Sequence, residues 1–180
     1  MPHTDTRTQA PPTRDRLVVM GVSGCGKSTL AQAIADHLGW TMVEGDTFHS
    51  AQSQAKMAQG IALTDEDRAQ WLQTLAWMIE RADTPTVYTC SALKASYRAQ
   101  LRRASPGRLG FVYMDLTQEE SFRRVSQRKG HPFPASLVAS QFAALETPRG
   151  EPDVLTVDAT ETTESQLEQV RQWIERSRDA

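Results

Sequence analysis

The chain has 180 residues, of which 39% are hydrophobic and 23% charged, a composition typical of one globular domain with a core large enough to stand alone. The formal net charge of −2 argues against a protein devoted to nucleic acid. No stretch approaches the roughly 20 apolar residues of a membrane span, so we expect no membrane partner. Cys25 and Cys90 have neither metal-ligand spacing nor a disulfide framework, which favours a reducing compartment and a cytoplasmic protein.

The first 15 residues are polar, are rich in Thr, Pro and Arg, and contain no apolar stretch as long as a secretory signal requires. We interpret residues 1–15 as a disordered tail that precedes a single domain over residues 16–180. Short strand-like runs then recur at residues 16–20, 41–43, 85–90, 109–115 and 154–157. Each run precedes a helix-like segment, which predicts an α/β fold with a five-stranded parallel sheet and helices on both faces.

The first strand-like run leads into Gly-Val-Ser-Gly-Cys-Gly-Lys-Ser at residues 21–28, which matches the phosphate-loop pattern G-x-x-x-x-G-K-[ST]. Glycines let the backbone curl around a polyphosphate with several N–H groups pointing inward. Lys27 can then lie along the β- and γ-phosphates, and the Ser28 hydroxyl can join the Mg²⁺ shell. The pattern predicts a nucleotide-binding protein that uses these residues: Gly21, Val22, Ser23, Gly24, Cys25, Gly26, Lys27, Ser28 and Thr29.

Two carboxylates, Glu44 and Asp46, directly follow the second strand-like run. Residues two apart at a strand end project to the same side, so one carboxylate can hold a metal-bound water while the other orients or deprotonates an acceptor hydroxyl. A solvated turn is the alternative, because Gly-Asp is common in turns. Asp115 also ends an apolar run, but it comes late in the chain and leads into a capped helix, so we interpret it as structural.

Two segments interrupt the alternation of strands and helices. We expect residues 46–63 to form a substrate flap and residues 124–136, approximately, to form a lid, because insertions after strand ends lie over the ligand crevice. Arg124 and Arg128 are four residues apart, so they are predicted to share one helix face beside the lid and to reach the transferring phosphoryl oxygens. A solvated basic face is the alternative reading of these two arginines.

Residues 94–131 carry nine Lys and Arg but only three Asp and Glu. This excess leaves open a function of a different class, a nucleotide-dependent switch or a nucleic-acid-processing ATPase. The sequence has no Asn-Lys-x-Asp element for guanine, and the cations are interspersed with helix-forming and lid residues rather than with a recognisable nucleic-acid module. We therefore expect no nucleic-acid partner.

Several segments together resemble the gluconokinases of the gluconate-utilisation type, small P-loop kinases related to shikimate and nucleoside monophosphate kinases. Beyond the phosphate loop, the resemblance includes Glu-Gly-Asp-x-x-His at 44–49, Lys-Met-x-x-Gly at 56–60, Leu-x-Asp-x-Asp-Arg-x-x-Trp-Leu at 63–72, Cys-Ser-Ala-Leu-Lys-x-x-Tyr-Arg at 90–98, Arg-Lys-Gly-His at 128–131 and Ser-Gln-Phe-x-x-Leu-Glu-x-Pro at 140–148. It implies a three-layer P-loop kinase fold and a homodimer that uses ATP and Mg²⁺ to phosphorylate D-gluconate to 6-phosphogluconate. A kinase for another hydroxylated acid, such as shikimate, is the nearest alternative.

The resemblance also implies roles for single residues. It makes Ser28, and Glu44 through water, the metal-binding residues. It assigns the sugar-acid site to Asp46, which faces the acceptor hydroxyl, and to His49, Arg68, Lys94 and Gln141. It makes Arg124 a nucleotide contact, and the catalytic set that it implies is Lys27, Asp46, Arg124 and Arg128. The chain departs from the family pattern at Ser50, Ser53 and Pro132.

Overall fold

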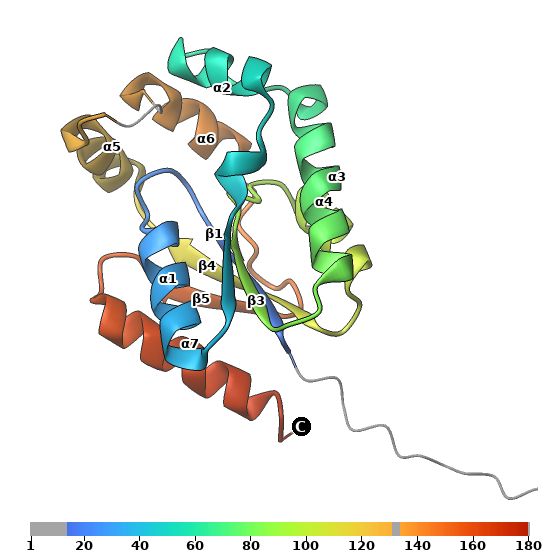
Figure 1. The fold of residues 1–180 in the computed structure, drawn as a ribbon. Coiled ribbons are helices and arrows are strands. Elements are labelled where there is room, and N and C mark those ends of the chain that lie inside the picture. The colour runs from blue at the N-terminus through green and yellow to red at the C-terminus, as the bar shows by residue number, and fades with distance from the viewer. Residues whose placement is uncertain (1–13, 131–133, 180) are drawn as a thin grey trace, which may run out of the picture.

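The structure is a computed structural model that describes residues 14–130 and 134–179 (Figure 1). Within these residues, five parallel strands form one sheet in the order β2-β3-β1-β4-β5. The strands are β1 (Arg16–Met20), β2 (Thr41–Glu44), β3 (Thr86–Thr89), β4 (Leu109–Asp115) and β5 (Val154–Asp158). The predicted α/β fold with a five-stranded parallel sheet is confirmed, and each predicted strand agrees with the structure to within one residue at either end.

The central strand β1 is buried along its whole length because it has a neighbour on both edges and helices on both faces. Its side chains alternate between two cores. Leu17 and Val19 belong to a cluster with Ile34 of α1 (Lys27–Leu38). Val18 and Met20 belong to a second cluster, on the other face of the sheet. This alternation explains why an unbroken apolar run, rather than a half-polar one, marks the strand in the sequence.

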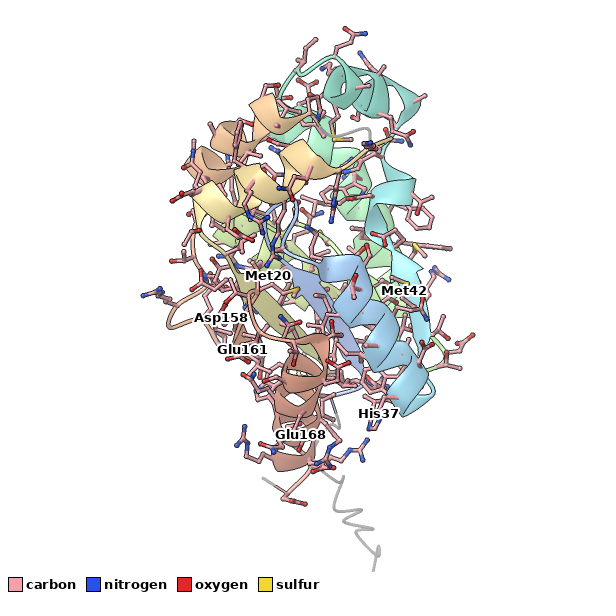
Figure 2. The ribbon with its side chains drawn as sticks, turned by 90° about the vertical axis from the view of Figure 1, so that its left-hand side faces the viewer. Met20, His37, Met42, Asp158, Glu161 and Glu168 are labelled. Atoms are coloured by element: carbon pink, nitrogen blue, oxygen red, sulfur yellow. The ribbon has the colours of Figure 1, made fainter. Side chains whose placement is uncertain are left out.

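Four helices cover the two faces of the sheet. Helices α1 and α7 (Thr163–Arg176) pack side by side on one face, and Figure 2 shows His37 of α1 and Glu168 of α7 near the same end of this pair. Helices α3 (Asp65–Arg81) and α4 (Ala95–Ala104) pack together on the other face. The result is the three-layer arrangement that the resemblance implies. Within the described residues, no helix combines the length and the apolar character needed to cross a membrane.

A third group of helices lies beyond the carboxyl ends of the strands, at the top of Figure 1. The elements of this group are η1 (Gly45–Phe48), α2 (Ala51–Ala58), α5 (Gln118–Gln127), η2 (Ala135–Leu137) and α6 (Val138–Ala144). The expected flap corresponds to η1, α2 and the segment that follows α2. Part of the expected lid, including Pro132, lies outside the described residues.

The departures at Ser50 and Ser53 have a local structural role. The Ser50 side chain caps α2 by accepting a hydrogen bond from the backbone N–H of Ser53 at 3.0 Å, and Ser53 itself is buried. A serine at this position satisfies one of the free N–H groups of the helix N-terminus. Ser50 thus stabilises the N-terminus of α2, the helix in the expected flap.

Two residues of the expected tail are packed against the folded domain. The Arg14 guanidinium lies 4.1 Å from the centre of the Trp173 ring and pairs with Asp153 at 2.5 Å. Asp15 accepts a backbone hydrogen bond from Thr86 at 3.0 Å and pairs with Arg16. This differs from the prediction for these two residues, because their partners come from distant parts of the chain. Residues 1–13 lie outside the described residues.

Candidate active site

The phosphate loop connects β1 to α1 and has the backbone shape that the motif predicts. Gly21, Gly24 and Gly26 have φ angles of +145°, +80° and +95°, which residues other than glycine rarely adopt. A Cβ at Gly21 would also lie 2.9 Å from the Cys25 sulfur and 3.0 Å from the Met114 carbonyl oxygen. Gly26 is the N-cap of α1, so the loop ends where backbone N–H groups favour an anion.

The Lys27 side chain lies over the loop itself. Its ammonium donates hydrogen bonds to the carbonyl oxygens of Gly21 and Val22, each at 3.1 Å. Phosphate oxygens would form stronger, charge-assisted bonds with the same group. The structure therefore places the cation next to the loop, where the motif predicts it.

Two hydroxyl groups hold the Glu44 carboxylate. The Ser28 hydroxyl donates to one carboxylate oxygen at 2.6 Å, and the Thr89 hydroxyl donates to the other. Hydroxyl and carboxylate oxygens are the ligands that Mg²⁺ prefers. The described residues contain no cluster of three or more His, Cys, Asp or Glu side chains that could hold a metal. Ser28 therefore fits as a direct ligand and Glu44 as the partner of a metal-bound water, for an ion that takes its other ligands from phosphate oxygens and water, as Mg²⁺ commonly does.

Gly45 separates the two site carboxylates and approaches β3 very closely. A Cβ at Gly45 would lie only 1.9 Å from the Thr89 carbonyl oxygen, so this position excludes every other residue without a backbone shift. The Asp46 carboxylate that follows is 63% exposed, and one of its oxygens lies 3.8 Å from His49 Nε2. Glu44 and Asp46 both line the same cavity, as their spacing predicts.

His49 is 8% exposed and stacks on Trp71, with ring centres 4.1 Å apart. Burial lowers the pKa of the imidazole, and nearby Asp46 raises it by a smaller amount. The ring is therefore neutral at pH 7. Its buried Nδ1 atom has no hydrogen-bond partner within the described residues.

A cavity of about 520 Å³ lies between the phosphate loop, the flap and α6. It brings together eight of the predicted site residues, namely Ser23, Lys27, Ser28, Glu44, Asp46, His49, Arg68 and Gln141. Sequence reasoning missed its other polar lining residues, Thr47, Gln54, Ser91 and Ser140, and its apolar ones, Met57, Ala62, Leu63 and Leu137. Position alone could have suggested Gln54, in the flap, and Ser91, just after a strand end.

Arg68 does not pair with the three acidic residues that precede it, within the part of the chain described. One of its guanidinium nitrogens donates to the Leu63 carbonyl oxygen at 2.9 Å. Asp65 pairs instead with Lys94 at 2.9 Å, and Asp67 pairs with Lys56 at 2.8 Å. Because Asp65 and Asp67 pair with lysines, they do not occupy Arg68, which remains a cation of the cavity lining.

Lys94 lies outside the cavity lining. Its ammonium pairs with Asp65, and the Tyr97 hydroxyl donates to the same carboxylate. These contacts tie the start of α4 to the start of α3. The structure does not bring Lys94 together with the other predicted substrate-binding residues, and its role in binding stays a prediction.

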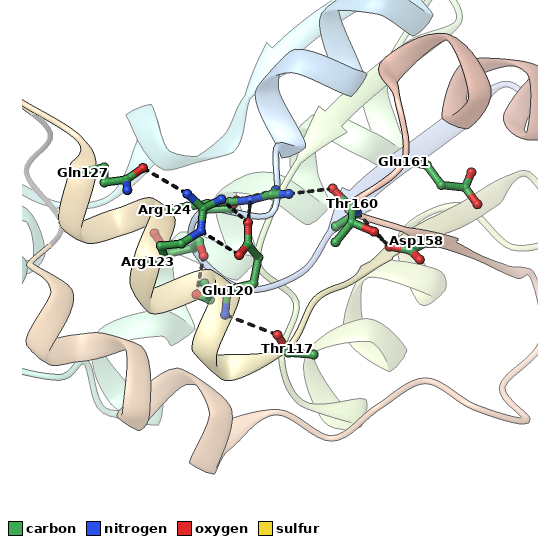
Figure 3. A network of polar contacts seen from close by, with 12 residues as sticks. Thr117, Glu120, Arg123, Arg124, Gln127, Asp158, Thr160 and Glu161 are labelled. Atoms are coloured by element: carbon green, nitrogen blue, oxygen red, sulfur yellow. Dashed lines mark hydrogen bonds and ion pairs between the residues drawn. The ribbon is translucent and has the colours of Figure 1, made fainter.

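Arg124 bridges two loops at the edge of the site (Figure 3). Its guanidinium donates to the carbonyl oxygens of Gly24 and Ala159, both at 3.1 Å, and to Glu120 at 2.9 Å. Arg123 and Arg124 lower the pKa of Glu120 to about 2, because both donate hydrogen bonds to its carboxylate. Arg124 therefore binds the phosphate loop through the Gly24 carbonyl oxygen, although it does not line the cavity.

The prediction that Arg124 and Arg128 share a helix face is wrong. Helix α5 ends at Gln127, and Arg128 has extended backbone angles of −76° and 128°. The helical spacing of four residues does not apply across this end. Arg128 is exposed outside the cavity lining, and the closure of either arginine over a phosphate stays a prediction.

Gln141 of α6 reaches the phosphate loop. Its side-chain oxygen accepts a hydrogen bond from the Ser23 backbone N–H at 2.6 Å, while Ser121 of α5 donates to the Ser23 carbonyl oxygen at 2.7 Å. Of the other loop residues, Val22 and Cys25 are buried, and Thr29 is exposed in the first turn of α1. Gln141 thus contacts the loop and the cavity at once.

The excess of cations between residues 94 and 131 is largely paired. Arg98 and Arg102 pair with Glu151, and Arg108 pairs with Asp15. The arginines of α5 share Glu120 in the same way. These pairs leave a weaker basic surface than the sequence indicates, which argues against the nucleic-acid alternative.

Known proteins are similar to this chain over most of its length. Residues 17–152 match the AAA domain family. The gluconokinase of Gluconobacter oxydans (strain 621H) is 44% identical to the chain over 157 residues, which cover 86% of this chain and 88% of that protein. The thermosensitive gluconokinase of Escherichia coli (strain K12) is 36% identical over 164 residues, which cover 89% of this chain and 87% of that protein. A gluconokinase crystal structure from Sinorhizobium meliloti 1021 is similar over 95% of both chains, with a TM-score of 0.83 and 37% identity. The chain therefore belongs to the gluconokinase family.

Proposed function

We propose that the protein transfers the γ-phosphoryl group of ATP to the terminal hydroxyl of D-gluconate, giving 6-phosphogluconate and ADP. The observation that carries this proposal is a single cavity lined by the phosphate-loop cation Lys27, the carboxylates Glu44 and Asp46, and the cation Arg68. The family relationship supports the choice of substrate, because similar proteins are named gluconokinases.

Phosphoryl transfer needs positioning and charge compensation more than covalent work by the protein. The loop N–H groups and Lys27 bind the phosphates. Ser28 and, through water, Glu44 would hold Mg²⁺, which would offset negative charge on the phosphate oxygens. Asp46 orients the acceptor hydroxyl and accepts its proton. The hydroxyl oxygen bonds to the γ-phosphorus as the bond between that phosphorus and the bridging oxygen of ADP breaks.

The substrate end of the cavity suits a polyol that carries one carboxylate. Arg68 supplies the cation for the carboxylate, and neutral His49 can exchange hydrogen bonds with hydroxyl groups. Gln54 and Ser140 add further polar partners. An analogue that lacks a hydroxyl would leave such groups unpaired, which lowers its rate strongly.

Closure of the lid belongs to the same proposal. Water near the γ-phosphate competes with the acceptor, so closing the site prevents loss of ATP to hydrolysis. Arg124, which already contacts the phosphate loop, and Arg128, which follows α5, are the lid cations that would approach the phosphates.

We also propose that the protein works as a homodimer in the cytoplasm. The family resemblance supports the dimer. Within the described residues, Cys25 and Cys90 are both free and buried, which supports a reducing compartment.

A coupled assay of ADP release tests the proposal directly. We expect ATP consumption to rise with D-gluconate and Mg²⁺, and a panel of sugar acids and hydroxy acids, shikimate included, to give lower rates. The product should carry its phosphate on the terminal carbon, which phosphorus NMR shows. Stimulation by DNA or RNA alone would reject gluconate phosphorylation, and a better substrate in the panel would reject gluconate as the preferred acceptor.

A further inference from the structure

Two peptide units separate Glu44 from Asp46. Each peptide unit forms a hydrogen bond with a different side chain. The N–H of Gly45, in the first unit, donates to the Thr89 hydroxyl at 3.0 Å. The carbonyl oxygen of Gly45, in the second unit, accepts from the indole N–H of Trp71 at 2.8 Å. The second unit includes the backbone nitrogen of Asp46. The indole therefore restricts the position of the Asp46 backbone.

The turn that carries Asp46 is exposed between two buried residues. Residues 46–48 are exposed, whereas Gly45 before them and His49 after them are buried. Trp71 contacts both of these flanking residues, through its N–H to Gly45 and through its ring face to His49. One side chain therefore holds both ends of the exposed turn.

Packing alone does not require a tryptophan here. The other buried side chains along α3, Leu72, Leu75 and Ile79, are aliphatic and fill the same core. Trp71 is 2% exposed and directs its one polar atom at the turn. A buried N–H group needs a hydrogen-bond acceptor, so the bond to Gly45 both stabilises the fold and fixes the orientation of the indole toward the turn.

We propose that Trp71 is a positioning residue for phosphoryl transfer, which aims Asp46 at the acceptor hydroxyl and holds His49 against the cavity wall. This inference rests on the proposed function, since it takes Asp46 as the residue that faces the acceptor. Trp71 acts through these two residues.

The substitution Trp71→Phe tests the role of the N–H, because it keeps an aromatic ring beside His49 but removes the donor. We expect kcat with gluconate to fall about ten- to a hundredfold, since small misplacements of a reacting group have effects of this size. KM for ATP should change less than about twofold, because the phosphate loop is untouched. Trp77→Phe, on an exposed residue of the same helix, is the matched control and should retain the original kcat.

A double substitution separates positioning from general packing. If Trp71 acts on kcat through Asp46, then Trp71→Phe in an Asp46→Asn background should lower kcat by less than about threefold, because groups that act as a unit are not additive. Fold-changes that multiply in the double variant would overturn the proposal. So would a Trp71→Phe variant with unchanged kcat.

Hydrogen exchange of the indole N–H groups in the unsubstituted protein gives a readout that does not depend on a folded variant. We expect the Trp71 N–H to exchange at least tenfold more slowly than the Trp77 N–H, and equally fast exchange would overturn the contact. Trp71→Tyr is a second variant without the indole donor, with the same expected loss of kcat. An unsubstituted protein that phosphorylates no sugar acid would instead refute the proposed function.

Discussion

Ser28, in the first turn of α1, and Glu44, at the end of β2, are joined by a hydrogen bond of 2.6 Å. This bond connects the helix that follows the phosphate loop to the end of the strand that precedes Asp46. Thr89 of β3 donates to the same Glu44 side chain. The proposed metal site is thus assembled from the ends of neighbouring elements, each fixed by the sheet.

The first prediction concerns the metal requirement. Glu44→Gln removes the negative charge that holds a metal-bound water, so we expect the Mg²⁺ concentration for half-maximal rate to rise about tenfold or more. Initial rates measured against free Mg²⁺ at saturating ATP test this. Glu66→Gln, on an exposed residue of α3, is the control. An unchanged Mg²⁺ dependence would remove Glu44 from the metal site.

The second prediction concerns the cation of the phosphate loop. Lys27→Met keeps most of the side-chain volume but removes the charge that compensates the phosphates, so we expect kcat to fall about a hundredfold or more. Steady-state kinetics with gluconate measure the fall, and circular dichroism checks that the fold is retained. Near-normal turnover in a folded variant would contradict the assignment of the loop.

The third prediction compares two candidate cations of the substrate site. Arg68 lines the cavity, whereas Lys94 lies outside its lining and pairs with Asp65. We expect Arg68→Ala to raise KM for gluconate about tenfold or more, because hydrogen bonds to charged groups contribute about 1.5–3 kcal/mol. Lys94→Ala should raise it less than about threefold. An equal effect of the two substitutions would show that the cavity lining does not identify the carboxylate partner.

The fourth prediction concerns pH. The pKa of His49 is lower in the folded protein than its ordinary value of 6.5, chiefly because the ring is buried. Below pH 6.5 the unfolded chain therefore binds a proton that the folded protein takes up less readily. The contribution of His49 to the free energy of unfolding is fully present above that pH and is lost as pH falls.

Urea unfolding at pH 7.5 and pH 5.5 measures this contribution. His49→Gln should reduce the difference in unfolding free energy between the two pH values, and His37→Gln, at an exposed position on α1, should reduce it less. A pH dependence that is the same with and without His49 would refute the prediction.

The fifth prediction concerns a fully buried arginine. The Arg98 guanidinium donates to the Glu151 carboxylate at 2.9 and 2.6 Å and to the carbonyl oxygen of Ala92 at 2.7 Å. Ala92 has a φ of +46°, in the left-handed region. Arg98→Leu removes this donor from the Ala92 carbonyl oxygen and leaves Glu151 paired with Arg102 alone, so we expect a loss of about 3–5 kcal/mol in the free energy of unfolding.

Chemical unfolding of Arg98→Leu measures the loss, and Arg103→Leu, on an exposed residue of the same helix, should change the stability by less than about 0.5 kcal/mol. Equal stabilities of the two variants would show that the buried network adds nothing to the fold.

Much of the fold and part of the candidate site could be predicted from local sequence patterns. Buried parallel strands are visible as continuous apolar runs, because both faces of each strand are covered. The phosphate loop is visible because its backbone angles require glycine at fixed positions. Glu44 and Asp46 are visible together because a strand end places residues two apart on one side.

Contacts between distant segments were not predictable in the same way. The helical spacing of Arg124 and Arg128 looked regular, but α5 ends between them. Three acidic residues precede Arg68, yet two of them pair with Lys94 and Lys56 from other elements. A pattern of charges shows which pairs are possible, and only the packing of helices selects among them.

The sequence by itself determined the parallel sheet, the phosphate loop and the family, because these depend on backbone conformation and on motifs of a few neighbouring residues. The tertiary structure alone decided that Trp71 meets Gly45 and His49, and that Gln141 meets Ser23. Such contacts join segments that are far apart in the chain, and their geometry follows from how the helices pack on the sheet.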